Sequence, residues 1–487
     1  MASVFKDEEF YLPAADQTYS LLPFRFIHLD SDRYVAVNEV GESQVLPRNE
    51  LELLVRKRLT RSSPLYYALK ASHFLEDSDS DIAADLLTLK VRSKRERIAR
   101  FTSLHMFVVT LRCNHSCQYC QVSRQSEDRS AYDMTEAMAD RALDFTFRSP
   151  SPAIKIEFQG GEPLLNFDLI KYIVSEAESR NAAEKRHLVF VIATNLSFLT
   201  DEILNFCRDH GILISTSLDG PADLHNANRP KPGKDSYQAT IEGIKRAREA
   251  LGVDQVSALM TTTRASLARV TEIIDEYVQQ GFKGIFLRNL SPYGFAIKTR
   301  YFDGYDSDSW LDFYCRGLDY ILKLNRQGYR FREFLTTTIL QKMLTPYETG
   351  FVNLRSPAGI GIAAIIFNYN GEVYPSDEAR MKAEMGDKIF CMGNLMTDTY
   401  EQMMLSSALL TPLEDSCAES VPMCEECAFL PYCGSDLDYH YATQQDFIGH
   451  KALSGFCKKN MGVCRYIIQK LEDNAEERQI LESWVNW

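Results

Sequence analysis

Seven of the twelve cysteines fall into two groups whose spacing suits metal binding. In the first group, Cys113, Cys117 and Cys120 form a C-x3-C-x2-C pattern. Three thiolates can hold three irons of a four-iron cluster and leave the fourth iron open to a ligand, whereas a fourth cysteine would close the site. Zinc with His115 as a further ligand is the alternative, but His115 lies between two of the cysteines, unlike the usual spacing of structural zinc ligands.

The second group combines Cys424, Cys427 and Cys433, in a C-x2-C-x5-C pattern, with Cys457 further along the chain. Four thiolates can bind zinc or a closed four-iron cluster, and the spacing alone does not choose between them. Cys417, which is nearer in sequence, is an alternative to Cys457 as the fourth ligand.

The composition is that of a globular protein: 487 residues, 45% hydrophobic and 25% charged, enough for about three domains or one large barrel with appendages. The formal net charge of -13 argues against nucleic acid as a partner, because an acidic surface repels phosphates. No apolar run is long enough for a transmembrane helix, and residues 1–17 lack the regions of a secretory signal. We therefore expect a cytoplasmic protein with no membrane contact, whose cysteines serve as metal ligands or catalytic thiols.

From residue 101, short apolar segments alternate with amphipathic ones, which predicts a strand–helix repeat. The expected strands are 104–111, 154–159, 187–194, 212–218, 255–261 and 284–290. Such a repeat implies parallel strands joined by crossover helices, in a barrel or an open α/β sheet. The first cysteine group follows the first strand, and ligands of these sheets bind at the carboxyl ends of the strands.

Four units are expected along the chain. They are an α+β module at 1–100, a barrel at 101–300, a helical connector at 301–350 and a cysteine-bearing unit at 351–487. Within the first unit, alternating residues at 24–45 predict a hairpin, followed by helices and a polar connector. In the last unit, an Asn-Gly pair predicts a hairpin at 365–375.

The first cysteine group, with Tyr119 before its last member, resembles the signature of the radical S-adenosylmethionine (SAM) superfamily. The run Gly160-Gly161-Glu162-Pro163 stands where this family has its GGEP motif. The resemblance implies a partial (β/α)6 TIM-like barrel. It also implies that the two glycines let the backbone approach the methionine amino group, with the Glu162 carboxylate nearby, and that Asn195 lies at the height of the ribose or carboxylate.

The SLDGP run at 217–221, together with Arg229, looks like the branch of the superfamily that matures peptides and sulfatases. There a serine hydroxyl and an arginine guanidinium bind SAM, and these roles fall on Ser217 and Arg229, with Leu290 lining the adenosine. Asp219 is expected to form a turn. The implied reaction is reductive cleavage of SAM to a 5′-deoxyadenosyl radical that abstracts a substrate hydrogen, with an electron donor such as flavodoxin or ferredoxin.

The carboxyl-terminal unit resembles the SPASM extension of radical SAM peptide maturases, which usually carries two auxiliary four-iron clusters. Ser376 and Leu437 stand where the family has ligands of the first auxiliary cluster, whereas the four cysteines of the second group match the second. The resemblance therefore implies a SPASM-like iron–sulfur domain with one auxiliary [4Fe-4S] cluster. Cys391, Cys417 and Cys464 remain unassigned.

Asp377 occupies the position at which sulfatase-maturing relatives have a carboxylate that removes a proton from the substrate. Because Ser376, next to it, replaces a cluster ligand, an ion pair with Arg380 is the alternative role.

The segments LLPFRF at 21–26 and YPSDEARM at 374–381 resemble the radical SAM maturase of the His-Xaa-Ser repeat system, which modifies a small ribosomally made protein. The amino-terminal module would then bind a precursor peptide at a sheet edge, although a cap that stabilises the barrel is the alternative. We expect an enzyme that crosslinks or otherwise modifies side chains of a peptide or small protein. A radical SAM enzyme acting on a small metabolite and a non-enzymatic iron–sulfur or zinc redox protein are the alternatives.

Overall fold

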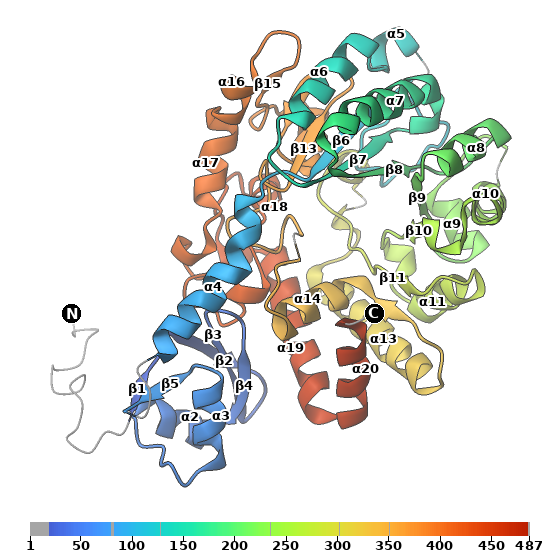
Figure 1. Ribbon diagram of the computed structural model, residues 1–487. Helices are drawn as coiled ribbons and strands as arrows, with labels where there is room; N and C mark the ends of the chain where they lie inside the picture. The colour runs from blue at the N-terminus through green and yellow to red at the C-terminus, as the bar shows by residue number, and fades with distance from the viewer. Residues whose placement is uncertain are drawn as a thin grey trace.

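The computed structural model describes residues 19–78, 82–126, 128–233, 235–300, 302–349 and 351–485. The amino-terminal segment considered above for a secretory signal lies outside these residues. The described chain forms a large α/β body and a small amino-terminal module, which are linked by the long helix α4 (Ala83–Ala99) (Figure 1).

The body is built on an eight-stranded sheet in the order β10-β9-β8-β7-β6-β13-β14-β15. Its parallel strands from the predicted repeat are β6 (Leu104–Thr110), β7 (Ala153–Gly160), β8 (His187–Ala193), β9 (Leu213–Ser217) and β10 (Val256–Leu259). The helices that follow these strands are α6 (Glu136–Phe147), α7 (Phe167–Glu184), α8 (Asp201–Asp209), α10 (Ser236–Leu251) and α11 (Val270–Gln279). They pack on the outside of the sheet (Figure 1), and the predicted α/β class is confirmed.

Local sequence explains where these helices begin. The hydroxyl of Thr135 accepts a hydrogen bond from the backbone N–H of Met138, and that of Thr200 accepts one from Ile203. Each threonine thereby satisfies a donor that the first helical turn leaves unpaired. The apolar stripes that follow bury residues against the strands in one continuous core.

The sixth expected strand is much shorter than its apolar pattern predicts. β11 (Gly284–Ile285) has two residues and pairs in parallel with β12 (Arg332–Glu333), while the main sheet ends at β10. The Glu333 carboxylate accepts a hydrogen bond from the backbone N–H of Leu287 at 3.1 Å. A side chain thus takes a donor that a longer strand would use in its ladder.

At the β6 edge of the parallel strands, the sheet is extended by strands from the carboxyl-terminal part of the chain. β13 (Ala364–Phe367) pairs in parallel with β6, and β14 (Glu372–Tyr374) and β15 (Gly393–Asn394) continue the sheet antiparallel. β13 and β14 form the hairpin predicted from Asn-Gly, with Ile366 opposite Tyr374. The sheet therefore crosses the boundary expected near residue 351.

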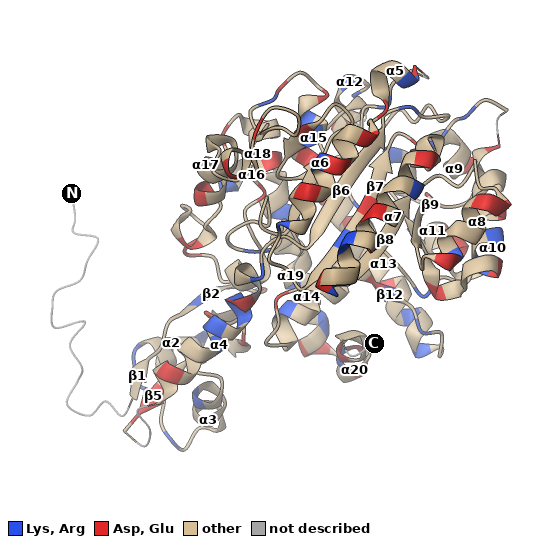
Figure 2. Cartoon of the chain, turned by 45° about the horizontal axis from the view of Figure 1, so that its top comes forward, with Lys and Arg blue, Asp and Glu red and all other residues tan. Residues whose placement is uncertain are grey.

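Further helices surround this sheet. They are α5 (Arg129–Tyr132), α9 (Ala222–Asn228), α12 (Phe295–Lys298), α13 (Ser307–Arg326), α14 (Phe334–Leu344), α15 (Asp377–Ala383), α16 (Tyr400–Met404), α17 (Ser407–Asp415), α18 (Leu437–Gln444), α19 (Gly455–Asp473) and α20 (Ala475–Val485). Figure 2 shows that acidic and basic residues are spread over the outer helices, whereas the strands are largely free of them. In the described part of the chain, no helix combines the length and apolarity needed to cross a bilayer.

The amino-terminal module has its own small core. β2 (Phe24–His28), β3 (Arg33–Asn38) and β4 (Ser43–Pro47) form an antiparallel sheet, β1 (Tyr19–Leu21) pairs with β5 (Leu75–Asp77), and α2 (Arg48–Val55) and α3 (Pro64–Ala71) pack beside them. β2 and β3 are the predicted hairpin. The polar stretch expected to be a connector is helix α4.

Buried hydrogen bonds join the module to the body. The Tyr432 hydroxyl donates to the carbonyl oxygen of Gly41 at 2.6 Å. From α4, the Lys94 ammonium donates to the carbonyl oxygens of Val40 and Lys342, at 2.5 and 2.7 Å. The module is thus held against the body by polar contacts whose loss would leave buried groups without partners.

We predict that Tyr432→Phe lowers the free energy of unfolding by about 1–3 kcal/mol, because it leaves the buried Gly41 carbonyl without its donor. Urea unfolding under anaerobic conditions measures the change. Tyr347→Phe is the control, since Tyr347 is 74% exposed. Equal stability of the two variants would show that the contact with Gly41 contributes nothing.

Candidate active site

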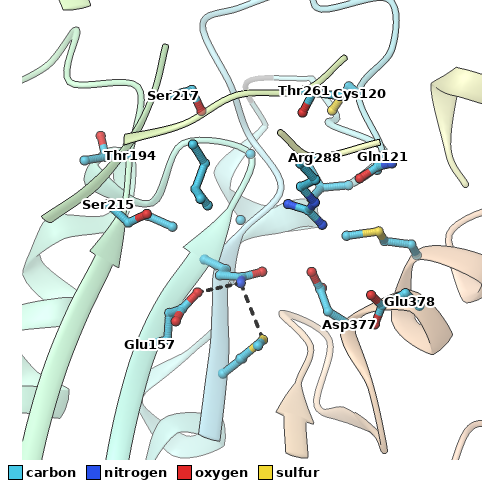
Figure 3. A pocket seen from close by; sticks show the side chains of 18 of the residues that line it. Cys120, Gln121, Glu157, Thr194, Ser215, Ser217, Thr261, Arg288, Asp377 and Glu378 are labelled. Carbon is cyan, nitrogen blue, oxygen red and sulfur yellow. Dashed lines mark hydrogen bonds between the residues drawn. The ribbon is translucent and has the colours of Figure 1, made fainter. Parts of the chain in front are cut away.

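A cavity of about 610 Å³ is lined by residues at the carboxyl ends of β7, β8 and β9. Most of the sequence-predicted site residues meet there. They are Cys113, Cys117, Tyr119, Cys120, Gly160, Gly161, Asn195, Ser217, Arg229 and Asp377. Figure 3 shows part of this lining, including polar side chains that the sequence analysis did not single out. Glu162 and Leu290 lie behind the wall and do not line the cavity.

The three cysteines lie on the loop that follows β6, and their chemistry suits a metal cluster. Burial raises the pKa of the Cys113 and Cys117 thiols to about 12. Such thiols carry protons at neutral pH, whereas coordination to a metal deprotonates them. Three sulfurs that share the cavity with space beside them thus fit a cluster with one open iron.

His115, the alternative zinc ligand, is engaged elsewhere. Its Nδ1 atom forms hydrogen bonds with Asn114 at 2.9 Å and with Asn195 at 3.0 Å. Burial lowers the pKa of His115 to about 3, so the ring is neutral. Among the described residues, no three His, Cys, Asp or Glu side chains are arranged to hold a single metal ion.

The glycine pair at the end of β7 is required by a close approach to the cysteine loop. Gly160 has φ +156°, and a Cβ there would overlap the carbonyl oxygen of Thr110. A Cβ at Gly161 would overlap the carbonyl oxygen of Arg112. The backbone N–H of Gly161 donates to Thr110 at 2.9 Å, which binds the two loops together. Only glycine fits at these two positions.

Glu162 ties the ends of β7 and β8 together from behind the cavity. Its buried carboxylate accepts hydrogen bonds from the Thr194 hydroxyl at 2.6 Å, from the Asn195 N–H at 2.8 Å and from the Leu164 N–H at 3.1 Å. Burial raises the pKa of Glu162 to about 7. Glu162 therefore fixes the backbone position of Asn195, which lines the cavity.

Asp219, expected to be a turn residue, is a buried carboxylate behind the cavity wall. It accepts a hydrogen bond from the Tyr119 hydroxyl at 2.6 Å. It also accepts from Nε and Nη2 of Arg229, at 3.1 and 3.2 Å. The guanidinium therefore uses two of its donors inside the protein and presents its remaining edge to the cavity. The sequence analysis assigned Asp219 no such role, because Tyr119 lies 100 residues away along the chain.

Leu290 supports this arrangement from behind. It packs with Tyr119 and Ala296 in a small buried cluster. Tyr119 thus contacts Leu290 as well as Asp219, which fixes the ring next to Cys120.

One wall of the cavity carries opposite charges, of which the sequence analysis singled out only Asp377. Asp377 and Glu378 begin α15, and Arg288 follows β11 on the facing side (Figure 3). Asp377 accepts a hydrogen bond from Nη2 of the buried Arg380 at 2.9 Å, which is the ion pair expected as its alternative role. Burial, with the neighbouring carboxylates, raises the pKa of Glu378 to about 7.

Comparison with known proteins identifies this site. Residues 107–276 match the model of the Radical SAM superfamily. The chain contains a radical SAM domain. This family uses a [4Fe-4S] cluster and SAM, and a domain of this kind, with sulfatase-maturing relatives, indicates an enzyme.

Two relatives show how far the similarity extends. The uncharacterized protein MJ0907 of Methanocaldococcus jannaschii is 30% identical over 188 residues, and the alignment spans 38% of this chain and 61% of that protein. The serine-type anaerobic sulfatase-maturating enzyme of Bacteroides thetaiotaomicron is 24% identical over 345 residues, spanning 66% of this chain and 79% of that enzyme.

Two solved structures share the fold. Native anSMEcpe with bound AdoMet superposes with a TM-score of 0.63 at 15% identity, over 79% of this chain and 99% of that one. Streptococcus suis SuiB bound to precursor peptide SuiA superposes with a TM-score of 0.51 at 14% identity, over 89% of this chain and 98% of that one. The radical SAM fold and the extension beyond it are thus common to these proteins.

The second cysteine group of this radical SAM protein lines a separate cavity of about 320 Å³. Cys424, Cys427, Cys433 and Cys457 all face it, whereas Cys417 does not. Burial raises the pKa of Cys433 to about 12 and that of Cys457 to about 11, and the neighbouring thiols of the group add to both shifts. Four convergent, half-buried cysteines fit one auxiliary cluster with Cys457 as the fourth ligand.

The positions expected for another auxiliary cluster are filled by ordinary protein contacts. The Ser376 hydroxyl donates to the Asp438 carboxylate at 2.6 Å and accepts from the N–H of Ala379 at 2.9 Å. Leu437 is buried at 1% exposure. Of the unassigned cysteines, Cys464 is a core residue and Cys391 lies beside the β14–β15 edge.

We predict that Asp219→Asn weakens SAM binding at least tenfold and lowers the free energy of unfolding by about 3 kcal/mol. This is the lower end for breaking a buried pair, because the Arg229 side chain is 15% exposed. Equilibrium binding of SAM to the reconstituted protein and urea unfolding measure the two effects.

Asp223→Asn is the matched control, since the Asp223 side chain is 70% exposed and pairs with Arg269 at the surface. Full SAM affinity in Asp219→Asn would contradict the role assigned to this carboxylate.

Proposed function

We propose that the chain reductively cleaves SAM and uses the resulting radical to modify side chains of a ribosomally synthesised peptide or small protein, by a crosslink or another radical modification. The observation that carries this proposal is the shared cavity, in which three half-buried cysteines meet Gly160, Gly161, Ser217 and Arg229. These three cysteines would hold a [4Fe-4S] cluster, which would supply the electron for the cleavage of SAM.

The residues of the chain serve to bind SAM and to orient it. Gly160 and Gly161 let the backbone come close to the methionine part, and the free edge of Arg229, held by Asp219, faces the carboxylate. Ser217 and Asn195 offer polar groups from the ends of β9 and β8. A cavity of about 610 Å³ falls within the range for small-molecule sites and has room for SAM and one substrate group.

A peptide substrate is favoured over a small metabolite by the relatives. The Bacteroides relative matures sulfatases, and SuiB is described with a precursor peptide. The amino-terminal module, with a sheet edge at β4, is our candidate for binding such a precursor. The resemblance to the His-Xaa-Ser maturase supports a small ribosomally made protein as the substrate.

Asp377 is our candidate for removing a proton from the substrate, with Arg380 fixing the orientation of its carboxylate. An external donor such as flavodoxin or ferredoxin supplies the electrons, and nucleic acid is not expected among the partners of this acidic chain. The cytoplasmic location stays a prediction from the sequence.

We predict that Cys120→Ala abolishes formation of 5′-deoxyadenosine from SAM with dithionite, because two remaining thiols cannot hold the cluster in its reactive form. Chromatography of the anaerobic reaction measures the product. Cys315→Ala is the control, since Cys315 lies on α13 and lines neither thiol cavity. Product at the wild-type rate from Cys120→Ala would remove the proposed activity.

We predict that the reconstituted protein holds about eight irons, in two four-iron clusters. Cys457→Ala is expected to bind about four, whereas Cys417→Ala keeps the full number because Cys417 does not face the second cavity. Iron analysis and electron paramagnetic resonance measure both. An iron content near twelve in the wild type, or a loss in Cys417→Ala, would contradict this assignment.

A further inference from the structure

A side cavity of about 220 Å³ adjoins the large cavity. The two share Arg288, Phe351, Asn353 and Glu378 in their linings. On its far side the side cavity is lined by Phe456 and Asn460, which also line the cavity of the second cysteine group. It therefore lies between the site of radical chemistry and the auxiliary thiols.

Arg288 points into this space without a protein partner. Among the described residues, its guanidinium takes part in no hydrogen bond and no ion pair. Figure 3 shows the side chain directed across the cavity toward the start of α15. A half-buried guanidinium of this kind has five unused donors and favours a ligand that offers an acceptor oxygen.

Glu378 faces Arg288 but does not form an ion pair with it, so space remains between the two charges. The Glu378 carboxylate has no side-chain hydrogen bond within the described residues, in contrast to Asp377, which is held by Arg380. It is therefore available to accept a hydrogen bond from a ligand.

A third polar group in the side cavity lacks a partner. The Tyr293 hydroxyl lines the cavity, the residue is 1% exposed, and no group in the described part of the chain forms a hydrogen bond with it. Buried hydroxyls are normally paired. An unpaired one here, with the two free charges, indicates that a polar ligand completes the site.

The remaining charges make the side cavity nearly neutral. Lys459 and Arg288 on its wall are balanced by Asp436 and Glu378. The Lys459 ammonium is occupied by Asn289 at 2.9 Å, and Asp436 accepts from Asn353 at 3.2 Å. A ligand with a net charge would upset this balance, whereas a neutral group with both an acceptor and a donor would match it.

We propose that the side cavity is a substrate subsite for an amide group of the peptide, with Arg288 donating to the amide oxygen and Glu378 accepting from the amide N–H. Tyr293 adds a third hydrogen bond. This inference rests on the proposed peptide-modifying function and specifies which chemistry of the peptide is recognised. The amide is either the side chain of an asparagine or glutamine or a peptide bond of the backbone.

A carboxylate or an ammonium group would fit less well. Above pH 7, where Glu378 is ionised, a carboxylate satisfies Arg288 but is repelled by Glu378, and an ammonium group satisfies Glu378 but is repelled by Arg288. Each would leave one charge in the site without a compensating partner. An amide is the common peptide group that satisfies both without a net charge.

The test uses the reconstituted full-length protein with SAM and fluorescein-labelled, blocked pentapeptides Ala-Ala-X-Ala-Ala, in which X is Asn, Gln, Asp or Ala. Fluorescence anisotropy measures their affinities. If the side chain is recognised, the Asn or Gln peptide binds about tenfold more tightly than the Asp and Ala peptides. If the backbone is recognised, the Asn, Gln and Ala peptides bind alike, and Asp binds more weakly.

Two variants separate recognition from a structural effect. Arg288→Met lowers the affinity for the best-binding peptides about tenfold. Glu378→Gln changes the affinity for these peptides by less than about threefold. It raises the affinity for the Asp peptide about tenfold, because the repelling charge is gone. A gain for one ligand beside little change for another is not produced by partial unfolding. Arg208→Met, at an exposed guanidinium on α8, is the control.

Binding of all four peptides with equal affinity, or unchanged peptide affinities in Arg288→Met, would overturn the subsite. Iron content and circular dichroism establish that each variant is folded. Formation of 5′-deoxyadenosine by the wild type reports separately on the proposed function, so a failed subsite and a failed activity are distinguishable.

Discussion

The buried carboxylate of Asp219 is the interaction on which the active site depends. It joins three parts of the chain: Tyr119 in the cysteine loop, Arg229 at the end of α9, and its own position after β9. A buried ion pair contributes little net stability, but breaking one is expensive, because it leaves a charge without a partner. Asp219 therefore fixes geometry more than it stabilises the fold. The cysteine loop, the guanidinium and the strand ends are held in one arrangement around the cavity.

The sequence predicted those features that local patterns determine. Short apolar segments that alternate with amphipathic ones predicted six parallel strands, of which five lie in the main sheet, and Asn-Gly predicted the β13–β14 hairpin. The sixth strand was overestimated because Glu333, distant in sequence, binds the backbone of Leu287. Motif spacing and the family resemblance predicted most of the residues that line the cavity, because the motifs of the family directly follow the ends of strands. Asp219, Arg288 and Glu378 were missed as functional residues, because each acts through a group from another part of the fold, as Asp219 does with Tyr119, and no local pattern encodes that.

The amino-terminal module and the auxiliary thiols are physically connected. Ile27 of β2 lines the cavity of the second cysteine group, and the Arg25 guanidinium donates to the backbone carbonyl of Glu425, between Cys424 and Cys427. From the other side, Arg465 on α19 donates to the carbonyl of His28 at 3.2 Å. One edge strand of the module is thus covered by the segment that would hold the cluster. Metal binding in that segment therefore bears on how firmly the module is positioned.

The pairing of β13 with β6 has a consequence for synthesis of the protein. β6 has β7 on one side soon after it leaves the ribosome, but its other side stays uncovered until β13, near the far end of the chain, is made. During that interval the nascent chain carries an open row of backbone donors and acceptors beside strongly apolar side chains, a surface on which other chains readily add strands. The topology thus leaves this half-built sheet exposed to aggregation while the chain is being made.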